Sequence, residues 1–263
     1  MYTVLSPAKK LDFSNPVKTL SKTKPIFGKR TEELVKRARE YTVQDLKMLM
    51  GVSDNLATLN SERFRDFDFH GKGLTKQAAL AFAGDVYLGF DAKSLDKDDM
   101  AFAQDRIGIL SGLYGLLRPL DAIQPYRLEM GSRVDTKRGS NLYEFWDDTI
   151  TEVIATNIEK SGTKVLINLA SNEYFSSINA KSLDAPVIQP VFKEIRDGKA
   201  KVISFLAKKA RGIMARHIVQ ERINVAEELK DFTLERYKFD KTASTANTWV
   251  FTRKFVPASQ LEN

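Results

Sequence analysis

The sequence predicts a mixed α/β fold in which a central mixed sheet is flanked by helices. The main observation is the run from Lys164 to Leu169, which is β-branched and nearly fully apolar, as in a central strand buried on both faces. Segments of helical periodicity precede this run, and further β-prone segments follow it. Because no linker, internal repeat or low-complexity segment interrupts the chain, we expect residues 1–263 to form a single domain.

The N-terminal elements follow from short local signals. Tyr2 to Leu5 is apolar and β-prone, and Ser6-Pro7 ends it, which predicts a buried first strand. Residues 14–30 are rich in Lys, Thr, Pro and Gly and predict an exposed basic connection. Thr31 has the features of an N-cap for a helix that reaches about Glu40, because two glutamates follow in the first turn.

The remaining elements are predicted from apolar periodicity and from the glycines that end it. Helices are expected over residues 43–50 (closed by Gly51), 53–65, 76–83, 98–110, 142–158 and 206–223. Strands are expected over residues 187–192, 201–205, 232–237 and 249–255, the last two antiparallel. The side chains expected to face inward are Leu56, Leu59 and Phe64 in the third helix and Phe102, Ile109 and Leu110 in the fifth.

Composition excludes several classes of function. Lys and Arg number 41 against 34 Asp and Glu, a net charge of +7, which favours polyanionic partners if the charge gathers on one face. The absence of cysteine excludes disulfides, thiolate–metal sites and thiol peroxidase chemistry. With only two histidines, we predict neither a metal site nor a cofactor. No signal peptide and no transmembrane segment are evident, so a cytoplasmic protein without membrane contact is expected.

The densest basic cluster lies within the last predicted helix. Lys209 and Arg216 fall about 20° apart at one margin of its apolar stripe, whereas Lys208 and Arg211 fall on the open side. Cations at a packed margin need an anionic partner or a wet cleft, so this helix either lines a phosphate-binding groove or presents a solvated face. His217 lies within the stripe, and its position favours a structural role over a catalytic one.

A glycine-rich turn stands between two predicted helices. Residues 110–115 read Leu-Ser-Gly-Leu-Tyr-Gly, and Arg118 follows. A hairpin from Gly112 to Gly115 between helices can direct backbone amides at a phosphate, as in a helix-hairpin-helix. The alternative is a purely structural turn.

A further turn-rich stretch, residues 125–131, combines an aromatic ring, a cation and a carboxylate. Tyr126 is suited to stacking on an unpaired base, and Arg127 is suited to binding a phosphate. Arg127 can instead pair internally with Glu129.

Polar residues also follow two predicted strands. Ser6, Lys9 and Lys10 follow the first strand, and Asn172 and Glu173 follow the central strand. Ligands of α/β sheets bind at the carboxyl ends of strands, so Lys9, Asn172 and Glu173 are candidates for one cleft. A lysine–carboxylate pair there can perform acid–base catalysis, or it can simply fix a loop.

Together these segments resemble the YaaA family of peroxide stress-resistance proteins. The matching stretches run in order over nearly the whole chain: residues 6–9, 84–87, 110–115, 117–121, 124–131, 142–146, 167–171, 173–175 and 207–212. The resemblance implies an unusual α/β fold with a positively charged cleft and a helix-hairpin-helix-like element. It also implies induction under hydrogen peroxide, control of unincorporated intracellular iron, and binding to double-stranded DNA and to DNA with unpaired regions.

Transferred to this chain, the resemblance implies a hairpin at Gly112 to Gly115 and a set of cleft cations. Together with the residues singled out above, the expected DNA-binding set is Lys9, Lys10, Gly112, Gly115, Arg118, Tyr126, Arg127, Lys208, Lys209, Arg211 and Arg216. Lys10 stands where a relative can have Thr, and Asn172 where a relative can have Asp. The Ser/Thr-rich stretch before Trp249 also lacks the acidic residues of relatives.

The sequence therefore predicts a DNA-binding protein of the peroxide stress response that limits free iron and DNA damage. The alternative is an enzyme acting on a nucleotide, a base or nucleic acid through Lys9, Asn172 and Glu173. No reaction is assigned to it.

Overall fold

The computed structural model describes residues 1–14, 20–70 and 73–255, and eight strands of this part form one mixed sheet. The sheet order is β4-β3-β1-β6-β7-β10-β9, and β8 pairs with the outer end of β7. The strands are β1 (Tyr2–Leu5), β3 (Ile107–Ser111), β4 (Gly115–Leu117), β6 (Leu166–Leu169), β7 (Val187–Arg196), β8 (Lys199–Lys201), β9 (Lys238–Asp240) and β10 (Thr248–Lys254). A separate antiparallel pair joins β2 (Lys76–Gln77) to β5 (Ala122–Ile123). The predicted mixed α/β class is confirmed.

The centre of the sheet is parallel and buried. β1 lies between β3 and β6 and runs parallel to both, with Leu5 opposite Ile109 on one side and Leu169 on the other. All residues of these three strands are buried, which explains their apolar, non-alternating sequences. Because the register is aligned, the chain leaves all three strands at the same edge of the sheet, here called the carboxyl edge.

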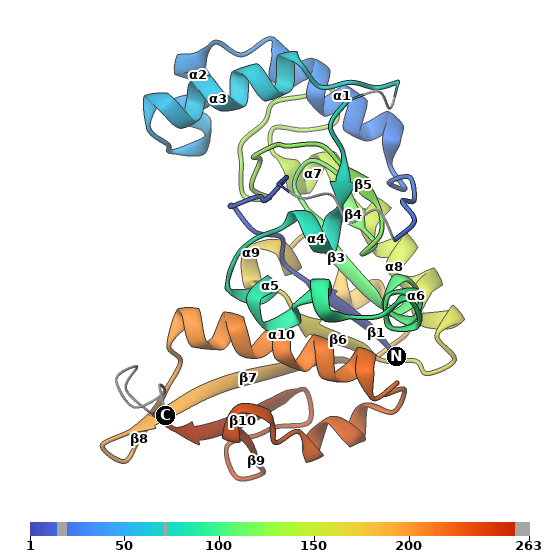
Figure 1. The fold of residues 1–263 in the computed structure, drawn as a ribbon, viewed down its shortest axis with the longest axis vertical. Helices are drawn as coiled ribbons and strands as arrows, with labels where there is room; N and C mark the ends of the chain where they lie inside the picture. Colours follow the sequence, from blue (N-terminus) through green and yellow to red (C-terminus); the bar gives the residue numbers. More distant parts are fainter. Residues whose placement is uncertain (15–19, 71–72, 256–263) are drawn as a thin grey trace.

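Helices pack around this sheet, and three of them form one end of the molecule. They are α1 (Gly28–Arg39), α2 (Val43–Met50), α3 (Asp54–Arg65), α4 (Ala78–Ala81), α5 (Asp85–Phe90), α6 (Lys97–Arg106), α7 (Leu142–Trp146), α8 (Thr149–Lys160), α9 (Asn172–Phe175) and α10 (Ser204–Gln220). Short 3-10 turns are η1 (Ala92–Ser94), η2 (Ala180–Ser182), η3 (Ala226–Asp231) and η4 (Leu234–Arg236). Figure 1 shows α1, α2 and α3 gathered at one end of the molecule and β7, β9 and β10 at the other. In the described part of the chain, no helix is both long and apolar enough to cross a lipid bilayer.

The crossing of α5 and α10 depends on two glycines. A Cβ added to Gly212 would overlap the carbonyl oxygen of Val86 and lie 2.8 Å from the Phe90 nitrogen. A Cβ added to Gly89 would overlap the carbonyl oxygen of Lys209. Backbone atoms of each helix therefore lie against a glycine of the other, which allows α5 and α10 to cross in close contact.

The predicted helix over residues 98–110 is wrong in its second half. α6 ends at Arg106, and Ile107 begins β3, which pairs with β1. Ile109 and Leu110 are buried as predicted, but in a strand. Gly108 is required there because a Cβ would lie 2.7 Å from the Tyr2 hydroxyl. An apolar run of this length is compatible with a helix or a strand, and pairing with a neighbouring strand decides between them.

The predictions for the first three helices are correct in position, and those for the first and third are wrong in detail. α1 begins at Gly28, with Phe27 as its N-cap, so Thr31 lies inside the helix and is buried. α2 matches its predicted bounds, and Gly51 adopts the left-handed conformation that ends it. In α3, Phe64 is buried, but Leu56 and Leu59 are exposed, because the helix packs through Ala57 and Asn60 instead.

Four other segments also differ from the predictions. Residues 76–83 form a two-residue strand and the short helix α4, and residues 142–158 are divided by Asp147, whose φ is 46°. Residues 232–237 contain the turn η4 and no strand, and the antiparallel partner of β10 begins at Lys238. The strand expected over 201–205 lies earlier, at β8. Residues 15–19 of the predicted basic connection lie outside the described residues.

Candidate functional site

The carboxyl edge brings together the loops that follow β1 and β6, as predicted. Ser6 follows β1, and its hydroxyl oxygen accepts a 2.8 Å hydrogen bond from the backbone nitrogen of Ser171, which follows β6. The Tyr87 hydroxyl of α5 donates to the carbonyl oxygen of Ser6 over 2.9 Å. These bonds fix the start of the loop that carries Lys9 and Lys10.

Glu129 holds two of the predicted cations at this edge. Its Oε1 atom lies 3.3 Å from Lys9 Nζ and 3.0 Å from Arg127 Nη2. The Lys9 side chain is 68% exposed, whereas those of Arg127 and Glu129 are 17% and 14% exposed. The internal Arg127–Glu129 pair that the sequence left open is therefore present, and one carboxylate oxygen serves both cations.

A third cation, Arg63 of α3, is close enough to Arg127 to be affected by its charge. The Arg63 guanidinium is half-buried and donates to the Asn60 side-chain oxygen over 3.3 Å. Burial, and secondarily the positive charge of Arg127, lowers the pKa of Arg63 below its ordinary value. Lys9, Arg63, Arg127 and Glu129, here called the cation cluster, thus combine three cations with one carboxylate. Such a net charge of +2 favours binding of an anion. Nothing in the sequence pattern indicated Arg63.

The two tyrosines near this cluster are core residues. Tyr126 is 5% exposed, and its hydroxyl forms a 2.7 Å hydrogen bond with the Ser111 hydroxyl. Tyr174 is 8% exposed. Burial raises the pKa of both phenols. The expectation that Tyr126 stacks on an unpaired base is not compatible with this position, because its ring is covered by protein.

The glycine hairpin is a buried β-hairpin and not a helix-hairpin-helix. Gly112 to Gly115 joins the antiparallel strands β3 and β4, and every residue from 111 to 117 is buried. The Gly112 carbonyl accepts a 3.0 Å hydrogen bond from Trp146 Nε1, and Gly115 has a φ of 69° against the Trp146 ring. The glycines serve close packing and a left-handed turn, so they do not present amides to a phosphate.

Arg118 also has a structural partner. Its guanidinium lies 2.8 Å from the fully buried carboxylate of Asp121 and donates to the carbonyl oxygen of Lys24 over 3.1 Å. The pair ties the turn after β4 to the segment that precedes α1.

The cations of α10 lie in four different environments. Lys208 is exposed, and Lys209 lies 3.2 Å from a Glu235 carboxylate oxygen. Arg216 donates to the carbonyl oxygens of Phe90 and Asp91. Arg211, predicted on the open side, is half-buried, because α10 packs against α5 as well as β7. Burial lowers the pKa of Arg211, and no described residue pairs with it. His217 packs edge-on against Phe232, with ring centroids 5.5 Å apart, in line with a structural role.

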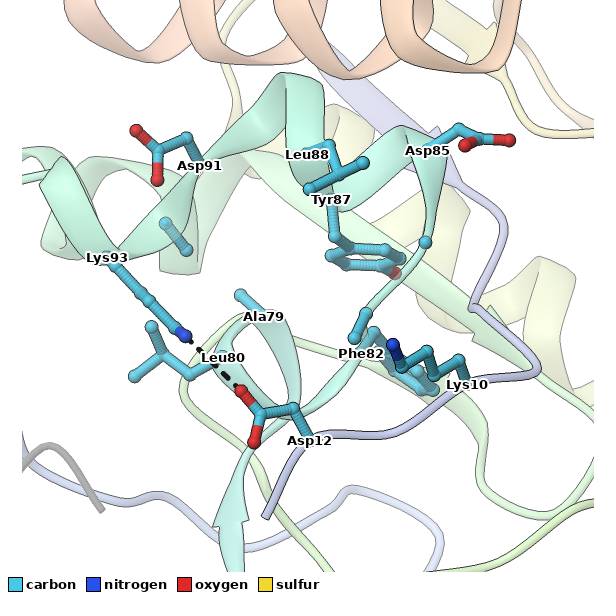
Figure 2. A pocket seen from close by; sticks show the side chains of 13 residues that line it. Lys10, Asp12, Ala79, Leu80, Phe82, Asp85, Tyr87, Leu88, Asp91 and Lys93 are labelled. Atoms are coloured by element: carbon cyan, nitrogen blue, oxygen red, sulfur yellow. Dashed lines mark hydrogen bonds and ion pairs between the residues drawn. The ribbon is translucent and has the colours of Figure 1, made fainter. Parts of the chain in front are cut away.

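Lys10 lines a separate hollow of about 400 Å³ between its loop and α5. Figure 2 shows Lys10 beside Phe82, with Asp12 and Lys93 paired across the hollow over 3.3 Å. Ala8 touches the start of α5 at Gly84, so this loop connects the cation cluster to the helix that α10 crosses. Lys9 and Lys10 therefore face different surroundings.

Lys9 and Glu173, two members of the predicted centre of Lys9, Asn172 and Glu173, each have another partner in the structure. Asn172 and Glu173 are exposed, and Glu173 Oε1 accepts from the Gly131 backbone nitrogen over 3.1 Å. The carboxylate that Lys9 contacts is Glu129. Among the residues that the structure describes, no group of three His, Cys, Asp or Glu side chains is arranged to hold a metal ion.

The fold and the cation cluster define a class: a mixed α/β protein with an ion-paired group of basic side chains at the carboxyl edge of its sheet. Comparison with known proteins identifies the family. The model of the family described as peroxide stress protein YaaA matches residues 1–243, and the chain belongs to this family. A UPF0246 protein of Burkholderia lata is 51% identical over 257 residues, covering 97% of this chain and 99% of the relative. UPF0246 proteins of Hahella chejuensis and Caulobacter vibrioides are 48% and 51% identical over 254 residues, covering 96% of this chain and 99% of each relative.

Proposed function

We propose that this protein is a cytoplasmic DNA-binding protein that helps limit unincorporated iron and DNA damage during peroxide stress. Membership of the peroxide stress family supports the stress role. The observation that carries DNA binding is the cation cluster, in which Lys9 and Arg127 share the single carboxylate of Glu129. Arg63, which bonds to Asn60, adds a third positive charge that Arg127 repels.

Backbone phosphates suit this cluster physically. Lys9 is exposed enough to leave Glu129 for a phosphate, and Arg63 has a neutral partner rather than a carboxylate among the described residues. An incoming phosphate relieves the repulsion between Arg63 and Arg127 and forms charge-assisted hydrogen bonds with both. Lys208 and Arg211 of α10 supply further positive charge without a carboxylate partner among the described residues.

Phosphate binding makes affinity depend on salt. In fluorescence anisotropy titrations with a labelled duplex and a labelled duplex containing an unpaired bubble, the logarithm of the association constant should fall linearly with the logarithm of the salt concentration. Each phosphate contact contributes a slope of about 0.9. The proposal fails if neither DNA binds at low salt, or if affinity is the same at low and high salt.

Glu129 competes with phosphate for the same cations. Removing its charge should therefore increase DNA affinity, whereas most substitutions in a binding site reduce it. Glu129→Gln keeps an oxygen that can accept from Arg127 but removes the negative charge. We expect it to bind DNA several-fold more tightly than the wild type, measured by anisotropy at fixed salt.

The matched control for this variant is Asp184→Asn, which removes a carboxylate from an exposed ion pair with Lys164. Lys164 precedes β6 and Asp184 precedes β7, so this pair lies at the edge of the sheet opposite the carboxyl edge. Asp184→Asn should leave DNA affinity unchanged. Unchanged or weaker DNA binding by a correctly folded Glu129→Gln variant would show that the pair is purely structural.

A further inference from the structure

A basic pocket lies at the outer end of the sheet, away from the cation cluster. It has a volume of about 380 Å³, within the roughly 300–1,000 Å³ that small-ligand sites occupy, and it is lined by Ile195, Arg236, Lys238, Thr252, Arg253 and Lys254. Figure 1 shows β7, β9 and β10, which carry most of this lining, at the end of the molecule opposite α3, the helix of Arg63. The pocket is therefore separate from the candidate site described above.

The strand register explains why the two lysines of the pocket lie on one face of the sheet. Lys238 of β9 is directly opposite Thr252 of β10, and Lys254 is beside Ile195 of β7. Because side chains alternate along a strand, Thr252 and Lys254 lie on the same side of β10. The register thus places Lys238 and Lys254 around the Thr252 side chain, in agreement with the lining of the pocket.

Three of the four cations in the pocket are not neutralised. Arg236, Lys238 and Lys254 are exposed, and none of them has a carboxylate partner among the described residues. Arg253 differs, because Glu194 accepts a hydrogen bond from its Nε over 2.9 Å. Unpaired cations around one hollow repel one another, so an anion that enters the hollow is attracted by all three.

The carboxylates beside the pocket are held by other groups. Asp240 of β9 accepts hydrogen bonds from the backbone nitrogen and the hydroxyl of Thr242 over 3.0 and 2.7 Å. Glu235 lies 3.2 Å from Lys209 Nζ and 3.1 Å from Arg253 Nη1. Neither carboxylate is therefore free to neutralise the three cations of the pocket.

The backbone at the rim of the pocket is strained. Glu235 and Arg236 have φ values of 52° and 64°, in the left-handed region that is unfavourable for residues other than glycine. Strained residues of this kind gather at functional sites, where surrounding contacts hold them in place. Arg253 Nη1 provides such a contact, because it donates to the Glu235 carbonyl oxygen over 3.0 Å. With this turn, Glu235 joins the ion pairs while Arg236 lines the pocket.

We infer that this pocket binds a ligand with two or more linked phosphoryl groups, held by Arg236, Lys238 and Lys254. A single phosphate monoester carries a charge of about −1.5 to −2, which is too small to balance three cations. The planar guanidinium of an arginine can bind two phosphate oxygens at once, and lysines add point charges. Nucleoside di- and triphosphates share this chemistry with inorganic polyphosphate. The inference does not depend on DNA binding by the cation cluster.

The test is calorimetric titration of the full chain at low salt with inorganic pyrophosphate and tripolyphosphate, compared with orthophosphate. Pyrophosphate should saturate a site and bind at least about tenfold more tightly than orthophosphate, because it reaches more of the cations. No saturation by pyrophosphate or tripolyphosphate, or binding of orthophosphate as tight as that of pyrophosphate, overturns the inference.

Titration with ADP distinguishes the two sources of linked phosphates. Binding of ADP as tight as that of pyrophosphate, or tighter, would identify a nucleotide as the ligand. Weaker binding of ADP would identify inorganic polyphosphate. Both outcomes support the inference, since the pocket holds linked phosphoryl groups in either case.

Arg236→Gln and Lys254→Gln test the location of the site. Both residues are exposed, so folding is not at risk. Each variant should weaken pyrophosphate binding by about threefold to tenfold. The matched control is Lys199→Gln in β8, which removes an exposed cation at the same end of the sheet but outside the pocket lining. It should leave the affinity for pyrophosphate unchanged.

Arg63→Gln distinguishes this pocket from the cation cluster. It should also leave the affinity for pyrophosphate at the pocket unchanged, whether or not the cluster binds DNA. If Arg236→Gln and Lys254→Gln weaken pyrophosphate binding no more than Lys199→Gln or Arg63→Gln does, the pyrophosphate binds elsewhere and the inference fails.

Discussion

Gly212→Ala is expected to destabilise the protein by at least about 3 kcal/mol, the upper end of the usual cost of overpacking a core. The reason is that the added methyl group overlaps backbone atoms of α5, namely the Val86 carbonyl oxygen and the Phe90 nitrogen. Backbone atoms cannot rotate away as a side chain can, so α5 and α10 must separate. The measurement is the free energy of unfolding from urea denaturation.

The control for this variant is Gly28→Ala at the first position of α1, where an added Cβ meets nothing within 4 Å. Alanine there should be neutral or stabilising by up to about 1 kcal/mol, because it restricts the unfolded chain. If Gly212→Ala and Gly28→Ala unfold at the same urea concentration, the close crossing of α5 and α10 is not what holds these helices together.

Glu194→Ala is expected to destabilise the protein by about 3–5 kcal/mol, because it breaks a buried ion pair and leaves the Nε side of the Arg253 guanidinium and the Tyr237 hydroxyl without their acceptor. Glu194 of β7 is 2% exposed and accepts from Arg253 Nε over 2.9 Å and from the Tyr237 hydroxyl over 2.5 Å. Arg253 in turn lies 3.1 Å from Glu235, which holds Lys209. Losing Glu194 therefore affects the sheet and also loosens the carboxylate that positions one cation of α10.

Its control is Asp184→Ala, which breaks the exposed ion pair with Lys164. Exposed pairs contribute about 0–1 kcal/mol, so this variant should remain close to the wild type in urea denaturation. A loss of less than about 1 kcal/mol in Glu194→Ala would mean that Arg253 finds another partner or hydrates, and the buried network would then not stabilise the outer sheet.

The sequence predicted the fold best where one signal was strong. The buried strands predicted at residues 2–5 and 164–169 are present as Tyr2–Leu5 and Leu166–Leu169, because parallel central strands are apolar throughout. Ile107–Ser111 was predicted as the end of a helix rather than as a strand. In an apolar run that follows a helix directly, the sequence does not indicate where the helix ends and the strand begins. The mixed direction of β10, parallel to β7 and antiparallel to β9, depends on distant segments that no local pattern encodes.

The candidate site was also predicted only in part, because some of its residues are brought together by contacts between distant segments. Lys9 was predicted to lie near Asn172 and Glu173, because polar residues after parallel strands gather at one edge, but the carboxylate that it contacts is Glu129. Arg63 could not be found, since α3 reaches the cluster only through tertiary packing. The glycines of the hairpin were interpreted through the helices expected on either side, and their strand neighbours give them a packing role instead.

The most direct test of phosphate binding by the cation cluster is the salt dependence of DNA affinity in Arg63→Gln. Compared with the wild type, the variant should bind more weakly at low salt, and the slope of the logarithm of affinity against the logarithm of salt should fall by about 1. Lys164→Gln removes a cation that precedes β6, at the edge of the sheet opposite the carboxyl edge. Its DNA affinity should have the same salt dependence as that of the wild type. Superimposable lines for Arg63→Gln and the wild type would contradict the proposal that this cluster binds backbone phosphates.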